Sequence, residues 1–259
     1  MNIFYCCLIL FMVGACGGWV LELFYRRFVS AKKWINPGFL VGPCLPLYGF
    51  GVTGLFLISY YLHFDTWFGI PSFVNDIIVI VIMSCTMTLI EYIAGIIFIK
   101  GMGIKLWDYT PRWGNIQGII CPLFSLIWTF VAAAFYYLFR TPCYYVISWF
   151  SEQTAINLWF PFVLGLIYGI FIVDVCFSCK LTHRISKFAK EKGIIVKIEE
   201  FKVEVRKAND KAKEKIHFVL AYYSNTPLKE LLENYISNVK GKFTSLKSKD
   251  DKTEDENEK

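Results

Sequence analysis

Five long stretches with few or no charged side chains limit the fold of this chain more than any other feature. A helix rises 1.5 Å per residue, so roughly 20 apolar residues cross a bilayer core about 30 Å thick. We therefore expect an all-α protein with five membrane-spanning helices, at residues 3–24, 40–62, 77–99, 116–139 and 156–179. No basic segment precedes the first stretch, so we expect it to be retained as an anchor and not cleaved as a signal peptide.

Composition excludes the main alternatives to a membrane protein. Apolar residues make up 56% of the 259 residues and charged residues 19%, and the mean hydropathy is +0.46. Soluble domains have about 45–50% apolar and about 25% charged residues. A chain with this much apolar surface cannot stay disordered in water either. The composition therefore favours the lipid bilayer as the surroundings of most of the chain.

The Lys and Arg residues of the loops predict the orientation of the chain. The first and third loops are basic, through Arg26, Arg27, Lys32 and Lys33 and through Lys100, Lys105 and Arg112. The second loop has neither Lys nor Arg, and the fourth has only Arg140. Because basic short loops stay in the cytoplasm, we expect a multi-pass plasma-membrane protein with an external N-terminus and a cytoplasmic C-terminus. Residues 141–151 are aromatic but too short to cross, so we expect them at the membrane surface.

A set of four residues occurs twice with one fixed offset. Trp34, Asn36, Pro43 and Leu47 are repeated 79 positions later as Trp113, Asn115, Pro122 and Leu126. Each set follows a basic loop and precedes an apolar stretch. Because both loops are expected on the same side of the membrane, the pattern predicts a parallel repeat of two helical hairpins. A chance match of common residue types is the alternative.

Beyond residue 180 the composition changes abruptly. Residues 180–249 contain 17 Lys and Arg against eight Asp and Glu. We expect a transmembrane domain at 1–180, a basic cytoplasmic helical region at 181–249 and a disordered acidic tail at 250–259. Two apolar stripes with helical spacing occur in the basic region, at Ile194, Ile198, Phe201, Val205, Ala208 and Ala212 and at Leu228, Leu231, Leu232, Tyr235 and Val239. They predict a helical hairpin or a two-chain coiled coil, and the interleaved acids disfavour nucleic acid as a partner.

Three carboxylates lie inside or at the edge of the apolar stretches: Glu22, Glu91 and Asp174. A charged group in a membrane helix is costly, so its presence indicates a function or a buried partner. Glu22 and Asp174 lie near helix ends, where an ion pair or a contact with water explains them equally well. Glu91 lies eight residues before Ile99, which places it about 12 Å inside the expected boundary. We therefore expect Glu91 to face the helix bundle or a cavity.

Further polar residues come from the same side of the membrane and complete a candidate binding site. Asn36, Asn115 and Asp108 belong to the basic loops that flank the carboxylate-bearing stretches. Together with the three carboxylates, they predict an inward-facing pocket for a polar solute or a lipid head group. A hydrogen-bond network that only fixes the helix register is the equal alternative. No phosphate-binding loop, no His-Glu-x-x-His and no Gly-x-Ser-x-Gly occurs, and we expect no cofactor, metal or catalytic residue.

Two motifs resemble the type IV ABC-transporter family of bacterial membrane proteins. The first is the stretch 36–51, with its Asn-Pro-Gly start and Pro-Leu-Tyr-Gly, and the second runs from Glu91-Tyr92 through 106–110 to Asn115, Gly118 and Cys121. Thr110 stands where Ser is expected. The resemblance covers about residues 14–180 and implies a permease-like inner-membrane subunit, a homodimer and a separate ATPase partner. Trp107 and Tyr109 of the second motif join the candidate substrate-binding residues.

Two other functions stay open. A lipid head-group enzyme would use Glu91 or Asp108 as a general acid or base, although the sequence shows no nucleophile. A membrane scaffold would recruit partners through its helical tail, for which the apolar stripes are the only support.

Overall fold

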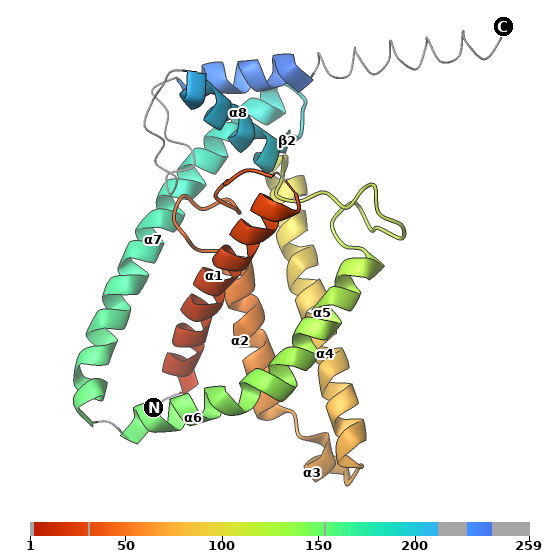
Figure 1. Ribbon diagram of the computed structural model, residues 1–259, viewed down its shortest axis with the longest axis vertical. Coiled ribbons are helices and arrows are strands. Elements are labelled where there is room, and N and C mark those ends of the chain that lie inside the picture. Colours follow the sequence, from red (N-terminus) through yellow and green to blue (C-terminus); the bar gives the residue numbers. More distant parts are fainter. Residues whose placement is uncertain (1–2, 31, 153, 212–226, 240–259) are drawn as a thin grey trace, which may run out of the picture.

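The computed structural model describes residues 3–30, 32–152, 154–211 and 227–239, without the side chains of 147–158 and 207–211. In this part the chain is almost wholly helical (Figure 1). Five helices there are long and apolar enough to cross a membrane, at Ile3–Phe28, Pro46–Phe68, Ser72–Gly101, Pro122–Val146 and Trp159–Glu191. The predicted all-α class with five spanning helices is therefore confirmed.

The first two helices, α1 (Ile3–Phe28) and α2 (Pro46–Tyr61), pack closely along their length. Glycines make this possible, because a Cβ atom added at Gly14 would lie 2.9 Å from the Tyr48 carbonyl oxygen, and one at Gly18 would overlap the Tyr48 ring. Small residues at such positions let two membrane helices approach within van der Waals contact. The pair forms one side of the bundle.

The next helices build the other side. After the short α3 (Phe64–Phe68), α4 (Ser72–Ile96) runs into a π-helical turn η1 (Ile97–Gly101) and packs against both α2 and α5 (Pro122–Ala134). A second π-helical turn η2 (Phe135–Phe139) leads from α5 into α6 (Arg140–Glu152). Helix α6 lies across the end of the bundle where the N-terminus is found (Figure 1). It contains the segment 141–151 that we expect at the membrane surface.

Two helix starts differ from the expected bounds. Residues 40–45 and 116–121 are loops, and α2 and α5 begin at prolines, Pro46 and Pro122. Proline suits the first helical turn, where its missing N–H has no partner to lose. Before α5, Gln117 and Gly118 have φ angles of 58° and 69°, which an α-helix does not accommodate. These two apolar stretches therefore begin several residues before the helices that they contain.

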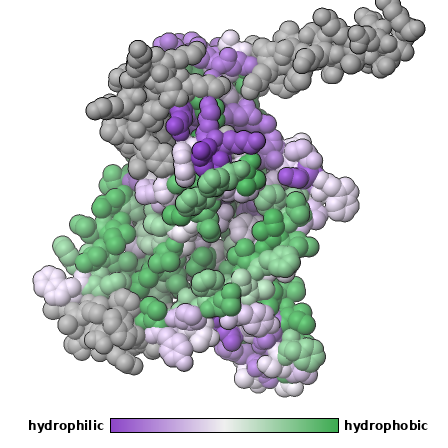
Figure 2. Space-filling view, in the orientation of Figure 1, coloured by the Kyte–Doolittle hydropathy of each residue, from purple (hydrophilic) through white to green (hydrophobic). Residues whose placement is uncertain are grey.

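The apolar side chains divide between an interior cluster and an exposed belt. The interior cluster joins α1, α2, α4, α5 and η2, and its least exposed members are Leu55, Phe56, Val79, Met83 and Ala132. Many large apolar side chains elsewhere on the helices are exposed, and Figure 2 shows them as a belt between hydrophilic regions at the two ends. A bilayer requires such a surface, because its core offers no water to polar groups.

The last spanning helix does not stop where the apolar stretch ends. Helix α7 (Thr154–Glu191) continues beyond residue 180 into the basic region. There its end packs against α8 (Ile198–Lys211) and a helix at 228–239, around a second cluster that includes Ile185, Phe201 and Leu232. Strand β2 (Val196–Lys197) pairs in parallel with β1 (Ile104–Lys105) of the third loop.

The two predicted stripes contribute to this second cluster within one chain. Ile198, Phe201 and Val205 are buried on α8, and the helix at 228–239 buries Leu231, Leu232 and Tyr235. Ile194 packs against the cluster but lies before α8, because the chain turns at Gly193 with a φ angle of 63°. Ala212 and the acidic tail lie outside the described residues. The duplication of the two hairpins stays a prediction.

Candidate functional site

Glu91 of α4 is the buried carboxylate of the membrane-spanning region. Only 3% of the residue is exposed, yet both of its carboxylate oxygens accept hydrogen bonds. The Tyr109 hydroxyl donates to Oε1 at 2.9 Å, and Trp128 Nε1 of α5 donates to Oε2 at 2.9 Å. Burial of a carboxylate is costly unless its oxygens are paired in this way. The geometry agrees with the expectation that Glu91 faces the bundle.

Aromatic side chains extend this site towards Glu22. The Trp128 ring lies edge-on to the Tyr48 ring, with 6.1 Å between their centroids, and the Tyr48 hydroxyl donates to Glu22 Oε1 at 3.1 Å. Glu22 of α1 and Glu91 of α4 are therefore connected by one row of aromatic donors. We call Glu22, Tyr48, Glu91, Tyr109 and Trp128 the carboxylate–aromatic cluster. It joins the two helix pairs of the bundle.

Tyr109 holds the third loop against this cluster. Its ring stacks on Phe124 of α5 with 4.2 Å between centroids and 16° between planes. Burial, together with the nearby Glu91 charge, raises the pKa of Tyr109 well above its usual range. The hydroxyl therefore keeps its proton and acts as a donor to Glu91.

Asp108, the residue before Tyr109, pairs with the C-terminal helical region. Lys105 Nζ lies 2.9 Å from Asp108 Oδ1, and Lys197 Nζ of β2 lies 3.2 Å from Oδ2. Burial alone would raise the pKa of Asp108, but hydrogen bonds from Thr110, Lys105 and Lys197 hold it well below its usual range. Asp108 is thus a fixed anion that ties the third loop to the C-terminal helices.

A similar set of contacts ties the first loop to α8. Arg26 bridges Glu22 and Glu199, at 3.6 Å from Glu22 Oε2 and 2.6 Å from Glu199 Oε2. Lys202 is 3% exposed and donates to the carbonyl oxygens of Asn36 and Gly38 at 2.8 Å each. Burial, reinforced by the Arg26 charge, lowers the pKa of Lys202 well below its usual value.

Three of the other expected site residues organise loops. Asn36 accepts from Trp19 Nε1 at 2.6 Å and donates to the Val41 carbonyl. Asn115 donates to the carbonyls of Thr110 and Arg112, and Trp107 donates to that of Ile119. Apart from Trp19 of α1, these partners are backbone carbonyls of loops, and none of them belongs to the carboxylate–aromatic cluster.

Asp174 serves a separate contact between α7 and the first loop. Its two carboxylate oxygens accept from the Gly42 amide at 3.2 and 3.1 Å, and Ser178 donates to Oδ1 at 3.2 Å. Ser178 in turn accepts from the Val41 amide at 2.9 Å. The structure therefore brings Glu22, Glu91, Tyr109 and, through the chain, Asp108 together, and places Asp174 in another network.

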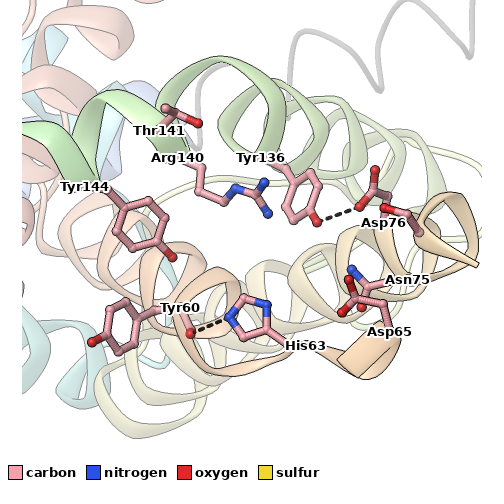
Figure 3. Close-up of a pocket in the computed structure, with 10 residues that line it drawn as sticks. Tyr60, His63, Asp65, Asn75, Asp76, Tyr136, Arg140, Thr141 and Tyr144 are labelled. Carbon is pink, nitrogen blue, oxygen red and sulfur yellow. Dashed lines mark hydrogen bonds between the residues drawn. The ribbon is translucent and has the colours of Figure 1, made fainter. Parts of the chain in front are cut away.

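At the opposite end of the bundle lies a polar pocket of about 580 Å³ (Figure 3). Tyr136 donates to Asp76 Oδ1 at 2.7 Å, and the guanidinium carbon of Arg140 lies 4.2 Å from the centre of the Tyr136 ring. Across the pocket His63 donates through Nε2 to the Tyr60 carbonyl at 3.0 Å. The lining residues are Tyr60, His63, Asp65, Ser72, Asn75, Asp76, Tyr136, Arg140, Thr141 and Tyr144. We call this the outer pocket, because the loop charges predict that this end of the bundle faces outside.

The sequence-based site did not include the outer pocket. Arg140 contributes to the predicted orientation alone, although Asp65, Asp76 and Arg140 are all charged residues between apolar stretches. That scarcity of charge was the signal that could have identified them. Among the described residues, no group of three His, Cys, Asp or Glu side chains gathers as a metal site would require.

Five helices long and apolar enough to cross a membrane define an α-helical membrane protein of the multi-pass class. Residues 9–179 match the family described as "Putative ABC-transporter type IV", and the chain belongs to that family. The match ends before the basic C-terminal region. Neither the comparison with curated proteins nor that with solved structures found a match.

Proposed function

We propose that the chain is the permease-like subunit of a bacterial inner-membrane ABC transporter, powered by a separate ATPase subunit. One observation carries this proposal. Two consecutive residues of the third loop, Asp108 and Tyr109, bind the cytoplasmic region and the buried carboxylate respectively. A movement of the cytoplasmic helices that pulls on Asp108 would therefore also displace the adjacent Tyr109 and its hydrogen bond to Glu91.

The energetics of Glu91 make this connection suitable for coupling. If the loop moves away, the Glu91 carboxylate loses one of its two donors in an environment that excludes water. Leaving a buried polar group unpaired costs about 1–3 kcal/mol. That cost is comparable with the free energy that separates two states of a switching protein. We therefore propose that the third loop removes the Tyr109 donor from Glu91, or restores it, when the ATPase subunit binds or hydrolyses ATP.

The proposed pathway connects the two polar sites. The carboxylate–aromatic cluster, together with the nearby loop residues Asn36 and Asn115, is proposed as the inward-facing site for a small polar solute. Because ionised carboxylates only accept hydrogen bonds, its two glutamates favour a solute with several donors. The outer pocket, whose side chains carry both signs of charge, is proposed as the external end of the same pathway.

A homodimer is proposed because one face of the bundle is poorly covered. Only 11% of the α7 span is buried, against 22–28% for the other four spans. Five helices are also few for a complete transport pathway. A second copy of the chain, packed against α7, would supply further helices to line it. In this arrangement the N-terminus lies outside and the C-terminal helices lie in the cytoplasm, next to the ATPase.

Purification of the tagged full chain from its native membranes in mild detergent tests the proposal. Mass spectrometry is expected to find a protein with a nucleotide-binding loop in the complex, and the complex is expected to hydrolyse ATP. Recovery of the chain with no such protein, together with turnover of phospholipid head groups, would favour the enzyme instead. A stable complex with other cytoplasmic proteins and no ATPase would favour the scaffold.

Variants of the coupling residues provide the matched comparison. Tyr109→Phe is expected to preserve the complex and its basal ATP hydrolysis while abolishing the response to solute, because it removes only the donor to Glu91. Tyr25→Phe is the control, since Tyr25 is 46% exposed on α1. Equal behaviour of the two variants would contradict the proposed coupling.

A further inference from the structure

A basic pocket of about 270 Å³ lies at the end of α1 that the orientation assigns to the cytoplasm. Its lining consists of four cationic side chains and one indole: Arg27, Lys32, Lys33, Arg206 and Trp34. Within the part of the chain that the structure describes, no carboxylate belongs to the lining. Four positive charges around so small a space repel one another. An anion bound inside the space would offset this electrostatic repulsion.

Backbone contacts fix the two guanidinium groups of this basic pocket. Arg27 Nη1 donates to the Lys32 carbonyl at 2.8 Å, and Arg206 Nη1 of α8 donates to the Trp34 carbonyl. A guanidinium has five N–H donors, so one such bond leaves it able to bind an anion as well. Lys32 has a φ angle of 53°, which turns the chain back towards Arg27. The cations therefore converge through a specific loop geometry.

The neighbouring acids are engaged elsewhere. Glu199 pairs with Arg26, Glu200 lies 3.7 Å from Lys197, and Glu204 accepts from Asn238 at 3.0 Å. These contacts join α8 to α1, to the adjacent β2 and to the helix at 228–239. Among the described residues, the lining of the basic pocket therefore holds positive charge without an acid to offset it, which favours an anionic ligand.

Three aromatic side chains beside the basic pocket indicate where the pocket lies relative to the membrane surface. The Phe24 ring stacks on Phe28 with 1° between planes, and Trp34 lies edge-on to both at 5.9 and 6.5 Å. The three residues are 48%, 68% and 38% exposed. Exposed aromatic rings at the end of a spanning helix lie at the level of the lipid head groups. An apolar surface for acyl chains thus adjoins a cationic site for a phosphate.

We propose that the basic pocket binds the phosphate of an anionic phospholipid from the adjacent leaflet. The head group would contact Arg27, Lys32, Lys33 and Arg206, while an acyl chain would lie along Phe24 and Phe28. Because Arg206 belongs to α8, the lipid would join the C-terminal helices to the end of α1. The site is independent of the outer pocket and of the carboxylate–aromatic cluster.

Native mass spectrometry of the full chain in detergent, titrated with phosphatidylglycerol, tests the proposal. The double variant K32Q/K33Q is expected to weaken binding about 10- to 30-fold, since each lysine near an anionic lipid contributes a several-fold factor. The control K100Q/R112Q removes two exposed cations of the third loop and is expected to bind as the wild type does. Equal affinities of the two double variants would overturn the proposal.

Two further arms separate the lipid from other ligands. Phosphatidylcholine, which has a phosphate but no net charge, is expected to bind at least tenfold more weakly than phosphatidylglycerol. Glycerol 3-phosphate tests a soluble phosphate ligand, and its binding as tightly as the lipid would overturn the lipid assignment. Arg206→Lys keeps the charge and serves as a second variant if K32Q/K33Q does not fold. It is expected to bind phosphatidylglycerol more weakly than the wild type, and unchanged binding would count against the proposed contact.

Discussion

Replacement of Glu91 by Gln is expected to remove the charge of the cluster while keeping its hydrogen bonds. Trp128 Nε1 can only donate, so the carbonyl oxygen of the introduced amide would turn towards it. The amide nitrogen would then face the Tyr109 hydroxyl, which is able to accept as well as donate. Two neutral hydrogen bonds would replace two bonds to a carboxylate.

The size of the effect follows from this exchange. Hydrogen bonds to charged groups contribute about 1.5–3 kcal/mol and neutral ones about 0.5–1.5 kcal/mol. Tyr109→Phe is therefore expected to lower the free energy of unfolding by about 1.5–3 kcal/mol in the wild type and by roughly half as much in the Glu91→Gln background. The difference, about 1 kcal/mol, is the coupling energy of the pair.

A double-mutant cycle on the four proteins measures this coupling. Reversible unfolding in mixed detergent micelles gives the four free energies, and near-wild-type circular dichroism confirms that each variant is folded. Additive effects of the two substitutions would refute the inference that Tyr109 acts on Glu91. The Glu91→Gln protein is also expected to lose transport, although it stays folded.

Three further predictions concern other parts of the molecule. Gly18→Ala is expected to lower the yield of folded protein in size-exclusion chromatography, because the added Cβ would overlap the Tyr48 ring. Gly17→Ala is the control and should leave that yield unchanged, because nothing lies within 4 Å of the added Cβ. Burial lowers the pKa of Lys202 in the folded state, so the unfolded tail binds more protons there and docking should strengthen as pH rises towards about 10.4. Limited proteolysis of the tail at increasing pH checks this sign, and faster cleavage at higher pH would contradict it. Asp76→Asn is expected to weaken solute capture from outside, measured as uptake in whole cells, and unchanged uptake would exclude the outer pocket from the pathway.

The sequence predicted the helices well because long apolar stretches are a local property. Five stretches gave five spanning helices, and the depth of Glu91 within its stretch correctly indicated burial. Helix starts were less predictable, since the chain before α5 is apolar but bends at Gln117 and Gly118. The hydropathy of a stretch does not indicate its backbone φ angles, so it does not show where within the stretch a helix begins.

The partners of each site depended on contacts between distant segments. Nothing in the local sequence indicates that Trp128 and Tyr109 donate to Glu91, because these residues come from three different elements. The sequence does not distinguish Lys202 from the other lysines of the basic region. Its burial arises only because α8 docks on the first loop. The outer pocket likewise joins α2, α3, α4, η2 and α6.

Hydrogen–deuterium exchange of the third loop in the purified complex tests the central proposal most directly. Residues 105–121 are expected to exchange faster when a non-hydrolysable ATP analogue is added, because Tyr109 would leave Glu91 as the cytoplasmic helices move. The Tyr109→Phe complex should show this faster exchange without nucleotide. Identical exchange with and without the analogue, in a complex that binds it, would contradict the account.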